Sequence, residues 1–365
     1  MKTICFLAGA RPNYMKIFPV WKEMSSQHPL VKKVLVHTGQ HYDEMMSGIF
    51  FREFSMPAPD FFLGVGSGSH GAQTAKVMVG LEELFLVNRP DILVVVGDVN
   101  STLAGALVAS KMGICLVHVE SGLRSFDRTM PEEINRMVTD VLADLLLTSC
   151  READKQLRKE GIPPEKIHFV GNVMIDSLNA LLPLAKKTAQ KNQGEWAKGK
   201  FILVTLHRPS NVDNPVRLDL IFRGLCEIAR KMPVVFPVHP RTRKNLAALN
   251  VGPFPPGLFL LDPLGYLDFI ALEASASLVI TDSGGVQEET TYLGIPCLTV
   301  RPNTERPVTI TQGTNRLVNP EIEPLAPLAL SAVLGGPRRS PCPIEGWDGQ
   351  AGPRIAELLY RLTSG

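Results

Sequence analysis

The sequence predicts an α/β protein with two Rossmann-like, doubly wound parallel-sheet domains that face a cleft. Two observations lead to this prediction. Short apolar, β-branched runs alternate with helical stretches along nearly the whole chain, and they are too short for helices and too apolar for half-exposed strands. The length of 365 residues also exceeds one typical domain of roughly 100–200 residues, so two domains are expected.

The apolar runs divide into two sets of predicted strands. The first set comprises Thr3–Phe6, Val34–His37, Ile92–Val96, Ile114–Val119, Leu145–Thr148 and Lys166–Val170. The second set comprises Phe201–Leu206, Val234–Val238, Leu258–Leu261, Leu278–Thr281, Cys297–Val300 and Arg316–Val318. The change between the sets falls near Gly171–Ser177, which gives a first domain at residues 1–171 and a second at 172–350.

Helix signals occur between the strands. Pro131-Glu132-Glu133 begins a helix, because proline suits the first turn and acidic side chains complement the helix dipole. Gly161 follows Lys159-Glu160 and ends another helix. Residues 334–353 are rich in glycine and proline, and Arg354–Leu362 is predicted to be a short helix. We expect the terminal segment 351–365 to pack back on the first domain.

Composition argues against several function classes. The formal charge of +2 is close to neutral, which disfavours a nucleic-acid-binding surface. The longest apolar stretches, such as Ile92–Val96, are far shorter than the ~20 residues of a membrane span. Met1–Phe6 runs directly into a strand with no cleavage site, and the six cysteines form no CxxC pair. We therefore expect a cytoplasmic protein without a nucleic-acid or membrane partner.

Polar residues follow the predicted strands, where open α/β sheets bind their ligands. In the first half these residues are Arg11, Lys16, Gln40, His41, Asp98 and Glu120. In the second half they are His207, Arg208, His239, Asp282, Ser283 and Arg301. The geometry of the sheets is therefore expected to gather cations, carboxylates and histidines in one cleft.

The turn Asp282-Ser283-Gly284-Gly285 joins a predicted strand to a predicted helix. Its free backbone N–H groups and its hydroxyl are suited to hold a diphosphate at the helix start. Glu289, one turn further on, is placed to accept the two hydroxyls of a ribose. Arg301 and Arg306 supply cations that pair strongly with phosphate. The simpler alternative is a capped helix start without a ligand.

A glycine-rich run at Gly66–Gly71 matches the dinucleotide pattern G-x-G-x-x-G but is a weak signal. It lies in the third strand–helix unit, and the next candidate acid, Asp98, is far along the chain for a ribose contact. HExxH and paired-cysteine spacings are absent, and His207 and His239 lack a clear third ligand. We therefore expect neither a nicotinamide cofactor nor a metal.

Several segments, spaced along the chain, together match the motifs of a known family. They are Thr38–His41, Gly97-Asp98, His118–Ser125, Pro131–Arg136, Asp282–Glu289 and Thr304–Pro307. With them the chain resembles the non-hydrolysing UDP-N-acetylglucosamine 2-epimerases from about Thr3 to Val318. The resemblance implies a glycosyltransferase-B-like fold, a homodimer, and cofactor-free interconversion of UDP-N-acetylglucosamine and UDP-N-acetylmannosamine.

The resemblance also implies roles for individual residues. It places Asp98, Glu120, Glu132 and His207 at the sugar as catalytic residues. The implied substrate contacts are Arg11, Lys16, Phe269, Ser283, Gly284, Gly285, Glu289 and Arg306. Phe269 matches a position on the uracil side. Which carboxylate serves which face of the sugar stays open, and Glu132 has the alternative role of a helix-start charge.

These residue types suit a change of configuration at C2 of the sugar. No carbonyl acidifies the C2 proton, so the C1–O bond must break first, which creates an oxocarbenium-like centre beside C2. Cations and the Ser283 turn would stabilise the departing UDP, and carboxylates would move the proton. The remaining alternatives are a hydrolysing 2-epimerase, a glycosyltransferase of the same architecture and a UDP-sugar sensor.

The sequence departs from the family pattern at informative points. The opening motif, typically Gly-Thr-Arg-Pro-Glu, ends in Asn13. Gln40, His41, Arg208 and His239 are retained as contacts for a possible second, effector diphosphate. However, Asp43 adds a carboxylate beside the first pair, and Pro209-Ser210 stands where an arginine usually follows Arg208. We therefore expect weaker activation by substrate than the resemblance alone implies.

Overall fold

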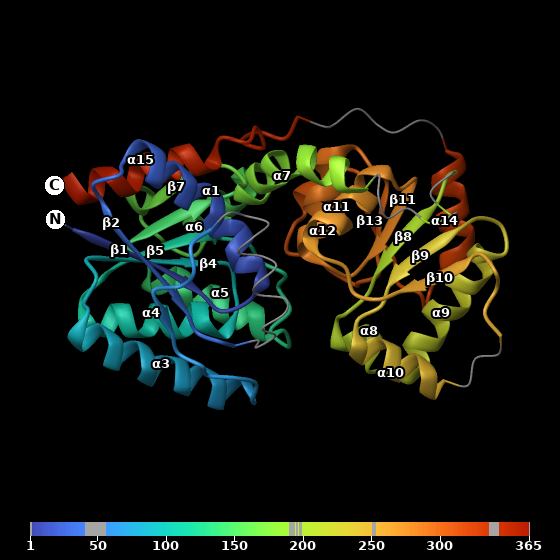
Figure 1. Cartoon of the computed structure of the whole chain (residues 1–365), viewed down its shortest axis with the longest axis horizontal. Helices are drawn as coiled ribbons and strands as arrows, with labels where there is room; N and C mark the ends of the chain where they lie inside the picture. The colour runs from blue at the N-terminus through green and yellow to red at the C-terminus, as the bar shows by residue number, and fades with distance from the viewer. Residues whose placement is uncertain are drawn as a thin grey trace. The chain divides into compact units, whose positions relative to one another are not determined.

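The computed structural model describes residues 2–40, 56–189, 194, 196, 199–249, 253–335 and 343–364. The chain forms two compact units, Met1–Asn179 with Glu345–Gly365, and Ala180–Ile344 (Figure 1). Each unit is built on a parallel sheet with helices on both faces. The predicted α/β fold with two Rossmann-like domains is therefore confirmed.

The first unit contains a seven-stranded parallel sheet in the order β3-β2-β1-β4-β5-β6-β7. Its strands are β1 (Thr3–Ala8), β2 (Lys32–His37), β3 (Phe61–Phe62), β4 (Ile92–Val96), β5 (Cys115–Ser121), β6 (Leu145–Thr148) and β7 (Ile167–Phe169). All five residues of β4 are buried, as expected for a strand covered on both faces. The direction of strand addition reverses between β1 and β4, which defines the switch point of this sheet.

The seventh strand, β3, was not among the predicted strands. It has two residues, pairs with Val36 and His37 at the edge of the sheet, and leaves Phe62 exposed. Phe61-Phe62-Leu63 is apolar, but a two-residue edge strand is too short to give the pattern of the longer buried strands.

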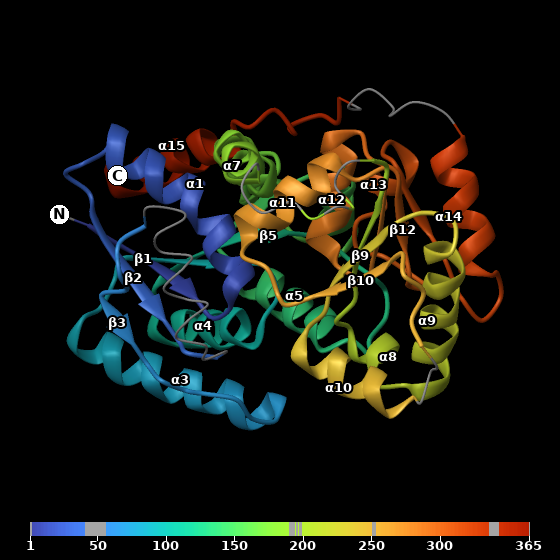
Figure 2. The same cartoon turned by 45° about the vertical axis from the view of Figure 1, so that its right-hand side comes forward.

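The helices of the first unit cover both faces of its sheet. They are α1 (Arg11–Gln27), α3 (His70–Val87), α4 (Asn100–Met112), α5 (Pro131–Leu142), α6 (Arg151–Lys159) and α15 (Ala351–Ser364), with a 3₁₀ turn at Pro164–Lys166. Helix α7 (Val173–Ala189) begins in the first unit and continues into the second. Helices α3 and α4 pack on one face, whereas α1 and α15 lie side by side on the other (Figure 2). The predicted helix start at Pro131 and the helix end before Gly161 are both observed.

The last helix, α15, belongs to the first unit. It packs along α1 so closely that a Cβ on Gly352 would lie 2.9 Å from Pro19 Cβ. The start of α7 is tied to the same region, because Asp176 accepts hydrogen bonds from the N–H groups of Ala351 and Gly352 and the Ser177 hydroxyl donates to Met15 O. The first unit therefore extends to Asn179 and resumes at Glu345, whereas the sequence predicted boundaries after residues 171 and 350.

The second unit contains a six-stranded parallel sheet in the order β10-β9-β8-β11-β12-β13. Its strands are β8 (Ile202–Thr205), β9 (Val234–Pro237), β10 (Leu258–Leu261), β11 (Leu278–Thr281), β12 (Cys297–Thr299) and β13 (Asn315–Leu317). All six were predicted to within one residue at each end. The switch point of this sheet lies between β8 and β11.

The helices of the second unit are α8 (Pro209–Val212), α9 (Pro215–Ala229), α10 (Pro240–Ala248), α11 (Tyr266–Ser275), α12 (Gly284–Leu293), α13 (Val308–Thr311) and α14 (Leu325–Leu334). Apolar residues of α9, α10 and α14 form one core against the sheet, and those of α11 and α12 form a second core on the opposite face (Figure 1). In the described part of the chain, no helix has the length and apolar character to cross a membrane.

Asp176, which caps α15, is expected to make stability depend on pH. Burial raises the pKa of its carboxyl to about 6, and the N–H groups of Ala351 and Gly352 offset burial only in part. Folding therefore favours the protonated acid, and this contribution to the free energy of unfolding is full below pH 4 and lost as pH rises through 6. Two pKa units correspond to about 3 kcal/mol. Urea unfolding of wild type and Asp176→Asn from pH 4 to 7 should show the variant gaining relative stability with pH; a constant difference would contradict the shifted pKa.

Candidate active site

Several of the predicted site residues follow the strands at the switch points of the two sheets. In the first unit, Arg11 begins the helix after β1, and Asp98 follows β4. In the second unit, His207 follows β8, and the Asp282-Ser283 turn follows β11. These are the carboxyl ends at which doubly wound sheets bind ligands. The glycine run at Gly66–Gly71 instead follows the edge strand β3, which fits its rejection as a dinucleotide site.

Asn13 organises the loop between β1 and α1. Its Oδ1 accepts hydrogen bonds from the N–H groups of Gly9 and Ala10, both at 2.9 Å. Its Nδ2 donates to Val96 O at 3.1 Å, at the end of β4. The asparagine found in place of the family's typical glutamate therefore caps α1 and joins the two loops of the first switch point.

Lys16 and Glu120 form a hydrogen-bonded ion pair in the interior of the first unit. Both residues are buried. Gly97, at the end of β4, has a φ of +66° and leaves the space that this pair occupies, since a Cβ there would lie 2.7 Å from Lys16 Nζ and 3.5 Å from Glu120 Oε2. The ammonium stabilises the ionised form of the Glu120 carboxylate, which is the form that can accept a proton.

The backbone of Glu120 is strained. Its φ of +69° lies in the left-handed region that glutamate rarely adopts, and the pairing of β5 with β6 shifts register between Val119 and Ser121. Such a conformation costs about 1–3 kcal/mol and is found mainly where it directs a functional side chain. The strain therefore agrees with the predicted role of Glu120.

Asp98 lies beside a buried arginine that the sequence analysis did not single out. Arg136 Nε is 3.3 Å from Asp98 Oδ2, and Arg136 Nη1 is 2.9 Å from Glu133 Oε2. The Arg136 side chain is 1% exposed, whereas that of Asp98 is 26% exposed. Asn135 Nδ2 also donates to Asp98 O at 2.8 Å. The carboxylate thus reaches solvent while a buried cation holds it in place.

Glu132 and Glu133 are neighbours with different surroundings. Glu133 is buried and accepts hydrogen bonds from Ser125 N, Ser125 Oγ and Phe126 N at 2.9–3.0 Å. Glu132, the predicted catalytic residue, is half-buried and makes no hydrogen bond or ion pair within the described residues. No described side chain therefore occupies its carboxylate, which is available to exchange a proton. The same would hold for a carboxylate that only complements the helix dipole.

Asp282 is the central buried carboxylate of the second unit. It accepts hydrogen bonds from His207 N, Arg208 N and Asn211 Nδ2, and its Oδ1 lies 3.1 Å from His207 Nδ1. Burial raises the pKa of Asp282, but the hydrogen bonds from His207, Asn211 and Arg208 outweigh burial and hold it below the ordinary value. An ionised Asp282 favours a proton on His207 Nδ1 and so leaves Nε2 of this half-exposed ring for a substrate.

Three arginines converge on Glu305 next to the start of α12. Arg301 Nη2 is 2.7 Å and Arg306 Nη1 is 2.6 Å from its carboxylate, and Arg208 Nη2 is 3.7 Å away. Arg306 also approaches Glu288 Oε1 at 3.1 Å. Gly284 leaves room for this cluster, because a Cβ there would collide with Arg306 Nη1. Cations therefore lie beside the helix start that was predicted to hold a diphosphate, with Ser283 at its N-cap and Gly285 in its first turn.

Glu289, the predicted ribose contact, lies in a buried acidic cluster. The Tyr266 hydroxyl donates to Glu289 Oε1 at 2.6 Å. Burial raises the pKa of Glu273 well above its usual value, and the adjacent Glu289 raises it further, so that Glu273 retains its proton. Phe269, the predicted uracil contact, is half-buried on α11, one turn from Tyr266.

The predicted effector residues are only partly described. Gln40 uses its side-chain oxygen to accept hydrogen bonds from Ser101 N and Oγ at 3.2 and 2.7 Å. His41 lies outside the described residues. Arg208 is directed to Asp282 and Glu305, and His239 Nδ1 accepts a hydrogen bond from Arg241 N at the start of α10. Burial, and then the charges of His207 and Arg241, lower the pKa of His239.

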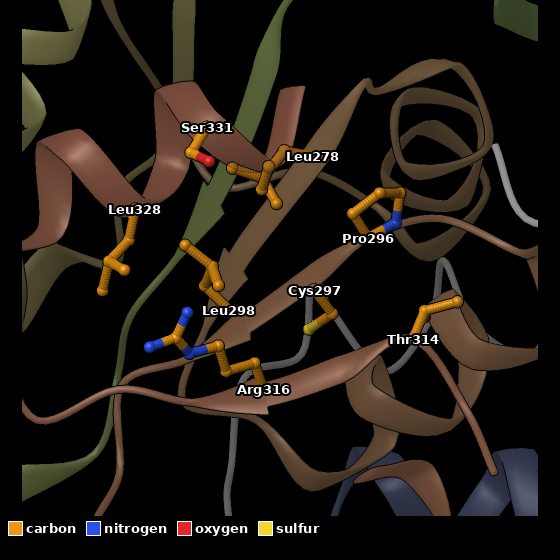
Figure 3. A pocket seen from close by; sticks show the side chains of 9 residues that line it. Leu278, Pro296, Cys297, Leu298, Thr314, Arg316, Leu328 and Ser331 are labelled. Atoms are coloured by element: carbon orange, nitrogen blue, oxygen red, sulfur yellow. The ribbon is translucent and has the colours of Figure 1, made fainter. Parts of the chain in front are cut away.

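A small cavity in the second unit does not coincide with these residues. Its volume is about 190 Å³, below the roughly 300–1,000 Å³ of typical small-molecule sites. Leu278, Cys297 and Thr314 line it at the amino ends of strands, with Leu328 and Ser331 from α14 (Figure 3). It therefore lies at the wrong end of the sheet for the predicted ligand.

Comparison with known proteins identifies the family of this chain. A family model for UDP-N-acetylglucosamine 2-epimerase matches residues 23–360. A UDP-N-acetylglucosamine 2-epimerase of Methanocaldococcus jannaschii is 41% identical over 368 residues, 98% of each chain. A UDP-2,3-diacetamido-2,3-dideoxy-D-glucuronate 2-epimerase of Pseudomonas aeruginosa is 42% identical over 362 residues, 98% of this chain and 99% of that protein.

A solved structure extends the similarity to three dimensions. The crystal structure of the Methanocaldococcus jannaschii UDP-GlcNAc 2-epimerase in complex with UDP-GlcNAc and UDP matches with a TM-score of 0.88 and 41% identity. The match covers 99% of this chain and 100% of the other. The ordered motifs, the two doubly wound sheets and these matches agree throughout, and the chain belongs to the UDP-N-acetylglucosamine 2-epimerase family.

Proposed function

We propose that this protein interconverts UDP-N-acetylglucosamine and UDP-N-acetylmannosamine at C2 by elimination and re-addition of UDP. The observation that carries the proposal is the pair of carboxylates at the first switch point, each next to a cation. Glu120 contacts Lys16, and Asp98 lies beside Arg136. A protein that only binds a sugar nucleotide, without catalysis, needs no such acid/base pair.

The proposed reaction proceeds in two balanced halves. The C1–O bond breaks and UDP departs with the electron pair, after which a carboxylate takes the C2 proton and leaves an unsaturated sugar. A proton is then returned to C2 on the opposite face, and the phosphate oxygen re-forms the bond to C1. Asp98, Glu120 and Glu132 are the proposed acid/base groups, since the two faces of the sugar require separate proton donors and acceptors.

The second unit is proposed to bind and stabilise UDP. The start of α12 and Arg306 would hold the diphosphate, Glu289 the ribose and Phe269 the uracil, while His207 Nε2–H would donate to the developing charge once the ring is protonated. Charge that develops on the leaving phosphate is stabilised most by donors that are already fixed in place. The Asp282 and Glu305 contacts support such fixed donors.

Incubation with UDP-N-acetylglucosamine alone in deuterated water tests the proposal. We expect a mixture of the two epimers, intact UDP linkage, and deuterium at C2 in both sugars. Release of free N-acetylmannosamine would instead identify a hydrolysing enzyme, and an inert substrate would favour a transferase or a sensor. Epimers without solvent deuterium would contradict the elimination mechanism.

A second substrate has specific support. The Pseudomonas aeruginosa relative, named for a diacetamido-glucuronate, matches this chain as closely as the Methanocaldococcus jannaschii relative does. Both names describe inversion at C2 of a UDP-linked sugar, so the same groups would serve. A comparison of kcat/KM for the two UDP-sugars distinguishes them, and we expect UDP-N-acetylglucosamine to be preferred.

We further propose that the protein is a cytoplasmic homodimer. Helices α3 and α5 carry exposed apolar side chains, among them Val79, Ile134 and Val141, that association would bury. Cys5, Cys150 and Cys297 are buried free thiols, which agrees with a reducing compartment. Sedimentation at close to twice the 40.0 kDa chain mass would support the dimer.

A further inference from the structure

His118 on β5 is a completely buried histidine that the proposed mechanism does not use. Its Nε2 lies 2.8 Å from Gly97 O, and its Nδ1 lies 2.7 Å from Asp140 Oδ1. The exposed fraction of both side chains is 0%. A carbonyl oxygen can only accept a hydrogen bond, so Nε2 must carry a proton and donate it to Gly97 O.

Asp140 fixes the other side of the ring. It also accepts a hydrogen bond from Gly122 N at 3.1 Å, and its Oδ2 lies 2.7 Å from Arg124 Nη1. Burial raises the pKa of Asp140, but His118 and Arg124 outweigh burial and hold it below the usual value, so the group is a carboxylate. Nδ1 therefore donates to Asp140, and both ring nitrogens are held by hydrogen bonds.

The group held by His118 is the turn that carries Asp98. Gly97 is also bound from β5 through its N–H, which donates to Val119 O at 3.0 Å. With a φ of +66° and no side chain, Gly97 is conformationally permissive, and these two hydrogen bonds to its backbone restrict its rotation. Rotation of the peptide between Gly97 and Asp98 would move the Asp98 carboxylate.

We propose that His118 is a positioning residue for epimerisation: its Nε2–H holds the Gly97 carbonyl, and Asp140 keeps the ring oriented for that hydrogen bond. This inference rests on the proposed function, because its effect is measured on the epimerase reaction. Misplacement of a catalytic group by about 1 Å can lower the rate by about 100-fold. The hydrogen-bond partners of His118, Gly97 and Asp140, belong to the first unit, whereas the UDP contacts are proposed in the second unit, so His118 should act on turnover alone.

Two substitutions at the same position separate the hydrogen bond from the histidine ring. Glutamine can place its Nε2–H where the His118 Nε2–H lies and so retain the bond to Gly97 O. Asparagine reaches only the position of Nδ1 and retains the side toward Asp140. We expect His118→Asn to lower kcat by about 10- to 100-fold and His118→Gln to recover most of that loss. The Kd for UDP and the KM should stay within about twofold.

Asp140→Asn provides the complementary variant. The amide can donate to His118 Nδ1 and accept from Gly122 N, so the ring keeps its orientation and its bond to Gly97 O. We expect a smaller loss of kcat than in His118→Asn. Equal losses in His118→Asn and His118→Gln, or a loss in Asp140→Asn as large as in His118→Asn, would overturn the proposal, as would unchanged kcat in His118→Asn.

Two further measurements are needed: the folded fraction of each variant and the epimerase activity of the wild type. Thermal unfolding of each variant shows whether the measured kcat belongs to folded enzyme, since a purely structural role would lower stability and leave kcat per folded molecule unchanged. Absence of epimerase activity in the wild type would refute the proposed function itself. The two failures are therefore distinguishable.

Discussion

Replacing Glu120 with glutamine is expected to lower kcat by about 10²–10⁴-fold, the range for loss of an acid/base group. Glutamine has nearly the same shape and its oxygen can still accept a hydrogen bond from Lys16, but it cannot take a proton from C2. Binding of UDP should be unchanged, because its proposed contacts lie in the second unit. Steady-state kinetics combined with calorimetric titration of UDP measure the two effects separately.

Other carboxylates serve as comparisons for this result. Asp98→Asn should show a loss of similar size, whereas Glu83→Gln, an exposed side chain on α3, should have none. Glu132→Gln is the most informative, since Glu132 makes no bond within the described residues. Near-normal turnover in that variant would assign Glu132 to the helix dipole, and full turnover in Glu120→Gln would exclude that residue as an acid or base.

Replacing Gly284 with alanine is expected to weaken UDP binding by about 10- to 100-fold, equivalent to one lost hydrogen bond to a charged group. A Cβ at this position would collide with Arg306 Nη1 and lie 2.8 Å from Glu305 Oε1. Both atoms are at the ends of flexible side chains, so the protein can fold while the arginine is displaced. Alanine also favours helix more than glycine, which protects α12 itself. Isothermal titration with UDP measures the effect.

Gly71→Ala is a matched control for the Gly284 variant. Gly71 also lies in the first turn of a helix, but an added Cβ would meet no atom within 4 Å. Its UDP affinity should equal that of wild type. If Gly284→Ala also bound UDP normally, Arg306 would not be a contact of the diphosphate.

The sequence predicted most of the fold because a parallel strand covered on both faces is a short, continuous run of apolar residues. Ile92–Val96 and Leu278–Thr281 are continuous apolar runs, and both form buried strands. The division of the chain was less accessible. The first eight residues after Gly171 join the first unit through contacts of Asp176 and Ser177 with α15 and α1, which no local pattern encodes.

The candidate site was predictable in part for the same reason. Asp98, Glu120 and Asp282 follow strands, so the sheet alone placed them at the ligand-binding edge. Their partners depend on tertiary contacts. Arg136 and Asp140 on α5 were not predicted as site residues. With Glu133 they recur at helical spacing and form a buried charged stripe. Buried charges need partners, so this spacing was a signal that could have identified them.

The packing of α15 on α1 has a consequence for how this protein is made. The first unit begins to leave the ribosome before the second, yet one of its helices, α15, is synthesised only after the whole of the second unit. Until α15 has been synthesised, Pro19 lacks its contact with Gly352, and the Asp176 carboxylate lacks the hydrogen bond from Gly352 N. The carboxy-terminal domain, by contrast, is one continuous segment and can close as soon as it has been translated. The unit that begins first is therefore completed after the second unit, and a nascent chain stalled before α15 would expose the first unit in an open form.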